Sequence, residues 1–138
     1  MTGLRLSDLL EPVMQLAYEA GRLIESELNR PDGPRGSDFK ADVDVEIEVL
    51  LRQRLKHILN CDFVGEETGC EHSGYPFCWV VDPNDGTADS LERRPGSAVS
   101  IGGRLRKRKT KHANGLRVRL KSEKSRWKRQ TRQESALI

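Results

Sequence analysis

The sequence has 138 residues, of which 36% are hydrophobic and 33% are charged, and its formal net charge is +3. A chain of this length forms at most one ordinary domain. No apolar run approaches the roughly 20 residues of a membrane span, and the first residues lack the basic and apolar blocks of a secretory signal. We therefore expect a cytoplasmic protein without membrane contact. Three cysteines, Cys61, Cys70 and Cys78, form no CxxC pair, which argues against a zinc site or a disulfide framework.

The charge is divided unequally along the chain. Residues 1–103 contain 19 acidic and 10 basic side chains, a balance of −9, whereas residues 104–138 contain 14 basic and 2 acidic side chains, a balance of +12. We predict that residues 104–138 form a basic, largely disordered tail, because they include too few apolar residues for a core. Only the alternation of Leu116, Val118 and Leu120 after an Asn-Gly pair favours one short strand there.

Two helices are predicted in the acidic region. Apolar residues recur at helical spacing in "LSDLLEPVMQLAYEAGRLIESELNR", where Ser7 or Asp8 can cap the start and Pro12 is tolerated near the first turn. The segment "RPDGPRGS", residues 30–37, then breaks the chain. A second helix is predicted from about Asp42 to Leu59.

The acids at the start of this second helix have a simple structural explanation. Asp42 suits the N-cap, and Asp44 and Glu46 place negative charge where the helix dipole favours it. Capping and solubility therefore explain these side chains without any function.

Three short apolar runs then predict strands, at residues 61–65, 77–82 and 96–103, which indicates an α/β protein. Acidic side chains follow the first two runs: Glu66 and Glu67 after one, Asp82 and Asp85 after the other. Ligand sites in such sheets tend to lie where strands end.

The segment "DPNDGT", residues 82–87, has the composition of a site for metal and phosphate. Two carboxylates three residues apart, held by Pro83 and Gly86, can converge on a hard cation such as Mg²⁺. Amides at the start of a following helix would point at an anion. An Asp-rich surface turn with an Asx cap explains the same residues equally well.

Three motifs in order resemble the inositol monophosphatase family, the magnesium-dependent, lithium-sensitive phosphatases. "DPNDGT" matches the family's DPxDGT signature, "VGEE" at residues 64–67 matches its glutamate motif, and "DVDVE" at residues 42–46 resembles its DxxVE element. The resemblance covers roughly residues 7–103. It implies that residues 1–103 are the N-terminal part of an α+β layered sandwich of the inositol monophosphatase and fructose-1,6-bisphosphatase type.

The resemblance also implies a site and a reaction. Glu66 and Asp82, with the carbonyl of Asn84, would bind a first Mg²⁺, and Asp82 and Asp85 would share a second. Thr87, partnered by Asp42, would orient and activate the attacking water, and the amides of Gly86 and Thr87 would hold phosphate. The implied substrate is a small phosphate ester, such as inositol monophosphate or a related sugar or nucleotide phosphate, and the family allows a homodimer.

The sequence also departs from the family pattern. "RPDGPRG" replaces what is often a β-hairpin carrying a lysine, and residues 104–138 contain no WDxAAG-type motif, since Trp127 is followed by Lys128. Family members are about twice as long, so we expect a truncated chain that is weakly active or inactive.

Two explanations of the basic tail stay open: a reading-frame shift, and an evolved extension that binds nucleic acid weakly and nonspecifically. The alternative to the enzyme is accordingly a basic nucleic-acid-associated protein with a vestigial metal turn.

Overall fold

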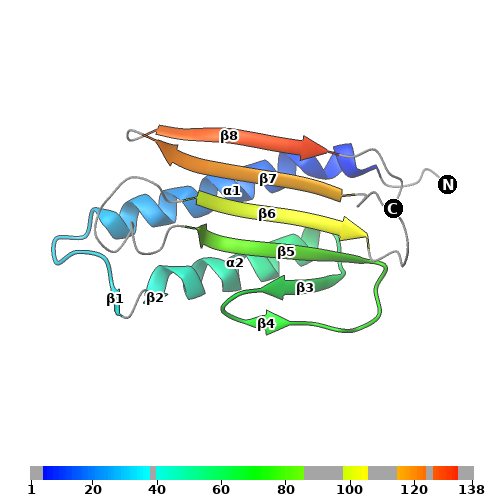
Figure 1. Ribbon diagram of the computed structural model, residues 1–138, viewed down its shortest axis with the longest axis horizontal. Helices are drawn as coiled ribbons and strands as arrows, with labels where there is room; N and C mark the ends of the chain where they lie inside the picture. Colours follow the sequence, from blue (N-terminus) through cyan, green and yellow to red (C-terminus); the bar gives the residue numbers. More distant parts are fainter. Residues whose placement is uncertain (1–4, 38–39, 86–97, 106–114, 124–125, 134–138) are drawn as a thin grey trace.

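The computed structural model describes residues 5–37, 40–85, 98–105, 115–123 and 126–133. In these residues two long helices cover one face of a six-stranded sheet, and a separate two-stranded hairpin lies at one end (Figure 1). This mixed architecture confirms the predicted α/β fold class.

Helix α1, Leu6–Leu28, has a buried stripe that faces the sheet and α2. The N-cap is Arg5, and not Ser7 or Asp8 as the sequence predicts. Asp8 lies in the first turn, where its carboxylate accepts a hydrogen bond from the backbone N–H of Arg5 at 3.4 Å. Pro12 lies in the second turn, one turn later than expected. The missing proline N–H removes the bond to the carbonyl of Asp8, and the packing of the helix compensates for this loss. The buried stripe consists of Leu6, Leu9, Val13, Met14, Leu16, Ala17, Ala20 and Ile24.

A β-hairpin follows α1, although the sequence predicts none there. Strands β1, Gly36–Ser37, and β2, Lys40–Ala41, pair antiparallel, so the expectation that "RPDGPRG" replaces a lysine-bearing hairpin was wrong. Lys40 itself lies in β2. The apolar periodicity used to predict strands gives no signal for two-residue strands such as these.

An ion pair holds the segment between α1 and this hairpin. Arg35 donates from its backbone N–H and its Nε to Oε1 of Glu27, each at 2.8 Å, and from Nη2 to Oε2 at 3.0 Å. Glu27 is buried, and these hydrogen bonds lower the pKa of its carboxyl group. Arg35 also contacts Glu46 of α2 at 2.9 Å, so one guanidinium links both helices.

Helix α2, Asp42–Ile58, agrees with the predicted range to within one residue. Its buried side includes the expected apolar residues Val43, Ile47, Leu51 and Leu55, and also two acids, Asp44 and Glu48. The chain leaving α2 is fixed to the sheet, because Nε1 of Trp79 donates to the carbonyl of Leu59 at 3.0 Å.

The six-stranded sheet has the order β4-β3-β5-β6-β7-β8. Strands β3 and β5 pair in parallel, and the other neighbours pair antiparallel. The three predicted strands correspond to β3, β5 and β6. The strands are β3, Asp62–Gly65; β4, Gly69–Cys70; β5, Phe77–Asp85; β6, Ala98–Leu105; β7, Gly115–Glu123; and β8, Arg126–Gln133.

The basic region adds two strands to this sheet, which corrects the expectation of a largely disordered tail. Leu116, Val118 and Leu120 of β7 are buried, and β7 contacts α1. Alternation of apolar and polar residues is sufficient to form β7, because α1 and β6 already provide apolar partners for its buried side chains. The basic region therefore needs no core of its own. The predicted boundary between residues 103 and 104 falls inside β6, which continues through the change in composition.

Candidate metal and phosphate site

The register of the two parallel strands brings the predicted metal ligands Glu66 and Asp82 to one edge. Gly65, the last residue of β3, pairs with Val81 of β5. Glu66 and Asp82 are the next residues of the two chains, and paired strands lie about 4.8 Å apart. Glu66 is exposed and Asp82 is half-buried. The parallel pairing therefore places two carboxylate-bearing residues side by side.

The predicted ligand segment forms part of a strand and not only a turn. β5 continues through Asp82, Pro83, Asn84 and Asp85, with a register shift between the pairs Asp82–Ser100 and Asp85–Ala98. Two residues of β5, Pro83 and Asn84, thus lie opposite one residue of β6, which is a β-bulge. Proline lacks an N–H for a sheet ladder, and a bulge is where an inner strand can accommodate it.

Part of the predicted site lies outside the described residues. Gly86 and Thr87 fall there, and for Asn84 and Asp85 the structure gives the backbone pairing alone. Within the described part of the chain, no three His, Cys, Asp or Glu side chains form a group that could hold a metal ion. The oxygen donors of Glu66 and Asp82 are of the type that Mg²⁺ prefers, so the described part of the predicted ligand set is chemically compatible with this cation.

The first turn of helix α2 lies at the same end of the molecule as the predicted metal ligands Glu66 and Asp82. In Figure 1 the amino end of α2 and the carboxyl ends of β3 and β5 lie on the same side of the view. Asp42, the predicted partner of Thr87, is exposed at the first position of the helix, whereas Asp44 is buried with 3% of its surface exposed. The sequence interpretation treated Asp44 as a helix-dipole charge. Its position on the stripe of Ile47 and Leu51 was the signal that could have identified it as inward-facing.

Sequence reasoning missed a second buried acid on α2, Glu48. Its Oε1 accepts a hydrogen bond from the backbone N–H of Glu67 at 3.1 Å, and its Oε2 accepts one from the N–H of Thr68. Glu48 is four residues after Asp44 and has no exposed surface. A carboxylate without water needs such donors, since an unpaired buried charge is strongly unfavourable.

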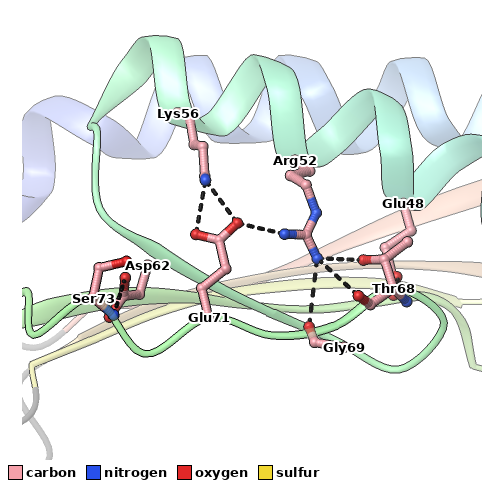
Figure 2. A network of polar contacts seen from close by, with 8 residues as sticks. All are labelled: Glu48, Arg52, Lys56, Asp62, Thr68, Gly69, Glu71 and Ser73. Carbon is pink, nitrogen blue, oxygen red and sulfur yellow. Dashed lines mark hydrogen bonds and ion pairs between the residues drawn. The ribbon is translucent and has the colours of Figure 1, made fainter.

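Two basic residues continue the polar side of α2 and bind the chain that follows Glu66 (Figure 2). Arg52 donates to Oγ1 of Thr68 at 2.5 Å and to a carboxylate oxygen of Glu71, and its guanidinium carbon lies 4.5 Å from the ring centre of Phe63. Lys56 donates to both carboxylate oxygens of Glu71 at 2.7 Å. The hydrogen bond from Lys56 lowers the pKa of Glu71, and the Arg52 guanidinium adds to the effect.

A further acid fixes the long connection between β4 and β5. Asp62 is fully buried at the start of β3, and both of its carboxylate oxygens lie 3.1 Å from the backbone N–H of Ser73 (Figure 2). The segment that carries Glu66 is thus held on both sides by side chains of α2 and β3, namely Glu48, Arg52, Lys56 and Asp62.

The architecture is that of a layered α/β protein with acidic residues at the edge where two parallel strands end. The model of the inositol monophosphatase family matches residues 5–109. The chain therefore belongs to the inositol monophosphatase family, as the three motifs indicated.

Two curated relatives show how much of the family's length the chain represents. It is 32% identical over 107 residues to Nus factor SuhB of Escherichia coli (strain K12), covering 72% of this chain and 40% of SuhB. It is 32% identical over 85 residues to inositol-1-monophosphatase ImpA of Mycolicibacterium smegmatis, covering 62% of this chain and 29% of ImpA. The chain thus spans well under half the length of these relatives.

Solved structures show the same fold. The extragenic suppressor protein suhB from Bartonella henselae superposes with a TM-score of 0.68 at 18% identity, covering 94% of this chain and 52% of that chain. The coverage of 94% includes residues beyond the part that the family model matches.

Neither helix in the described part of the chain is long and apolar enough to cross a membrane.

Proposed function

We propose that this chain carries part of the site of a magnesium-dependent phosphomonoesterase that acts on a small phosphate ester. The observation that carries the proposal is the parallel register of β3 and β5, with Gly65 opposite Val81, because it supports a shared role for Glu66 and Asp82. Family membership and the name of the relative ImpA support phosphatase chemistry.

Each residue has a role in this proposal. Glu66, Asp82, Asp85 and the carbonyl of Asn84 would hold Mg²⁺, which supplies Lewis-acid stabilisation of charge and lowers the pKa of bound water. Thr87 would orient the attacking water, and the amides of Gly86 and Thr87 would bind the phosphate oxygens.

The carboxylate that assists Thr87 comes from α2. Asp42 is the residue that the motif assigns, whereas Asp44 is the buried acid on the side of the helix that faces the sheet. Replacing each with asparagine separates them: the true partner is the one whose loss lowers hydrolysis while the chain stays folded.

The test begins with metal binding, because the chain spans 40% of SuhB and we propose that it is weakly active or inactive by itself. Mn²⁺ is a suitable paramagnetic probe for a Mg²⁺ site. We expect the unaltered chain to bind Mn²⁺ and Asp82→Asn to lose most of that binding. Hydrolysis of a phosphomonoester in Mg²⁺ should be slow and should also require Asp82. Equal Mn²⁺ binding by the Asp82→Asn variant would contradict the proposal.

A second candidate function is nonspecific nucleic-acid binding, and the strand register favours it. Gly103 faces Phe77 and Trp79 in the core, so its neighbours Gly102 and Arg104 face the opposite side of the sheet. Gly102 pairs with Arg117 and Ser100 pairs with Arg119, which places three arginines of β6 and β7 on the side away from the helices. Phosphate binding by such a surface weakens steeply with salt.

Arg104→Ala combined with Arg117→Ala tests this second candidate, and Arg22→Ala on α1 is a matched control. All three arginines are exposed. If the sheet surface binds DNA, the double variant should weaken binding at low salt and reduce its salt dependence, while the Arg22 variant should lose less. Equal effects would indicate only a general charge effect.

A further inference from the structure

We propose that Glu48 is a positioning residue that fixes the backbone around Glu66 and so sets the metal affinity of the site. This inference rests on the proposed function, in which Glu66 is a metal ligand. Glu48 itself is fully buried beneath the chain and would not touch the metal.

The hydrogen bonds of Glu48 are directed at the two residues that follow Glu66. Its two oxygens accept separately from the backbone N–H groups of Glu67, at 3.1 Å, and Thr68. Hydrogen bonds from backbone amides to an ionised carboxylate are among the stronger ones in proteins. The carboxylate therefore determines the path of the chain immediately after Glu66.

The same carboxylate also lies against the residue before Glu66. A Cβ atom on Gly65 would lie 2.5 Å from Oε1 and 2.7 Å from Oε2 of Glu48, which is closer than such contacts allow. Glycine is therefore required at position 65 for Glu48 to occupy its place. The residue before Glu66 is therefore in close contact with Glu48, and the two residues after Glu66 are hydrogen-bonded to Glu48.

A second helix residue supports this segment from another position. Arg52, one turn after Glu48, donates to Oγ1 of Thr68 at 2.5 Å and to the carbonyl of Gly69 at 3.4 Å (Figure 2). The segment is therefore attached to a rigid helix through side chains on successive turns. Rigid attachment of a ligand's backbone reduces the ordering that metal binding requires.

The test compares Glu48→Gln with Glu46→Gln. Glutamine keeps the shape of Glu48 but replaces one acceptor oxygen with a donor NH₂ group, so one backbone amide loses its partner. Glu46 lies on the same helix and is exposed, and its ion pair is with Arg35 and not with the segment around Glu66, which makes Glu46→Gln a control for loss of a charge and of an ion pair on α2. We expect Glu48→Gln to weaken Mn²⁺ binding about 10-fold or more, in the range found when residues behind metal ligands are changed. The Glu46 variant should bind nearly as the unaltered chain does.

Amide hydrogen exchange without metal provides an independent readout. In the unaltered chain the N–H groups of Glu67 and Thr68 should exchange slowly, and in Glu48→Gln they should exchange faster, while Phe63 and Val81 in the adjoining strands stay protected. Fast exchange at Glu67 and Thr68 in the unaltered chain would overturn the inference, and this result does not depend on whether any variant folds.

The outcomes also separate this inference from the proposed function. If the unaltered chain bound no Mn²⁺, the proposed function and the inference would both fall. If it bound Mn²⁺ and Glu48→Gln bound equally well with the fold preserved, only the positioning role would be excluded.

Discussion

Gly103 of β6 lies against the outer edge of the Phe77 ring, at a point where an added side chain would clash. A Cβ atom at this position would contact Phe77 Cζ, would lie 3.0 Å from Phe77 Cε1 and would lie 3.2 Å from Trp79 Cζ3. The two rings meet edge to face with their centres 5.3 Å apart. Trp79, which pairs with Gly103 across the strands, is completely buried.

Gly103→Ala should therefore destabilise the fold, because the added methyl group forces the rings of Phe77 and Trp79 apart. Overpacking of this kind costs about 1–3 kcal/mol, measurable as a lower midpoint of urea unfolding. Gly102→Ala is the matched control, since its added Cβ would meet only backbone oxygens at 3.6 and 3.7 Å. If the two variants unfolded at the same urea concentration, the close packing described at Gly103 would be incorrect.

The sequence predicted elements whose signals are local and missed those that depend on tertiary partners. Periodicity located α2 to within one residue at its end, and apolar runs located β3, β5 and β6. The hairpin β1–β2 has no apolar signal, and β8 becomes a strand only through pairing with β7.

Physical chemistry alone left the candidate site undecided, because a metal site and an Asp-rich surface turn explain residues 82–87 equally well, and the motifs favoured the metal site. The three motifs identified Glu66 and Asp82, which the parallel register places side by side. Asp44 was interpreted only as a helix-dipole charge, which is the ordinary explanation for an acid at a helix start, and Glu48, in the second turn of α2, was not singled out. Both side chains are buried on the same side of α2 as the apolar stripe, whereas Asp42 is exposed.

Acid should weaken the attachment of Glu71 to α2. Its folded-state pKa is lower than the ordinary value of about 4.5, chiefly through the hydrogen bond from Lys56. The stabilisation is therefore fully present above about pH 4.5 and is lost as the pH falls through the lowered folded-state value. Lys56→Met should reduce the free energy of unfolding at pH 7 by no more than about 1 kcal/mol, because the pair is partly exposed.

Urea unfolding of the unaltered chain and of the Lys56→Met variant, each at pH 7 and at pH 3, provides the measurement. The difference in stability between the unaltered chain and Lys56→Met should shrink at the lower pH, as Glu71 becomes neutral. A difference that grew on acidification would show that the sign of this linkage is wrong.

The three cysteines should differ sharply in reactivity. Cys70 is exposed in β4, whereas Cys61 and Cys78 are buried. Burial raises the pKa of Cys61 to about 12, and the neighbouring Cys78 contributes to the shift. Because the thiolate is the reactive form, an aromatic disulfide reagent at pH 8 should label one thiol quickly in the folded chain and three in urea. Cys70→Ser should abolish the fast phase; fast labelling that persisted in this variant would show that a buried cysteine is accessible.

Val118 tests whether the basic region belongs to the core. It is completely buried in β7 and pairs with Ile101 of β6, whereas its neighbour Arg117 is exposed. Val118→Ala removes two buried methyl groups and leaves space beside α1, so it should lower the free energy of unfolding by about 2 kcal/mol. Arg117→Ala on the other face should change it by less than about 0.5 kcal/mol. A disordered tail would make both substitutions neutral, so a large effect at Val118 alone would establish that residues beyond 103 complete the sheet against which α1 packs.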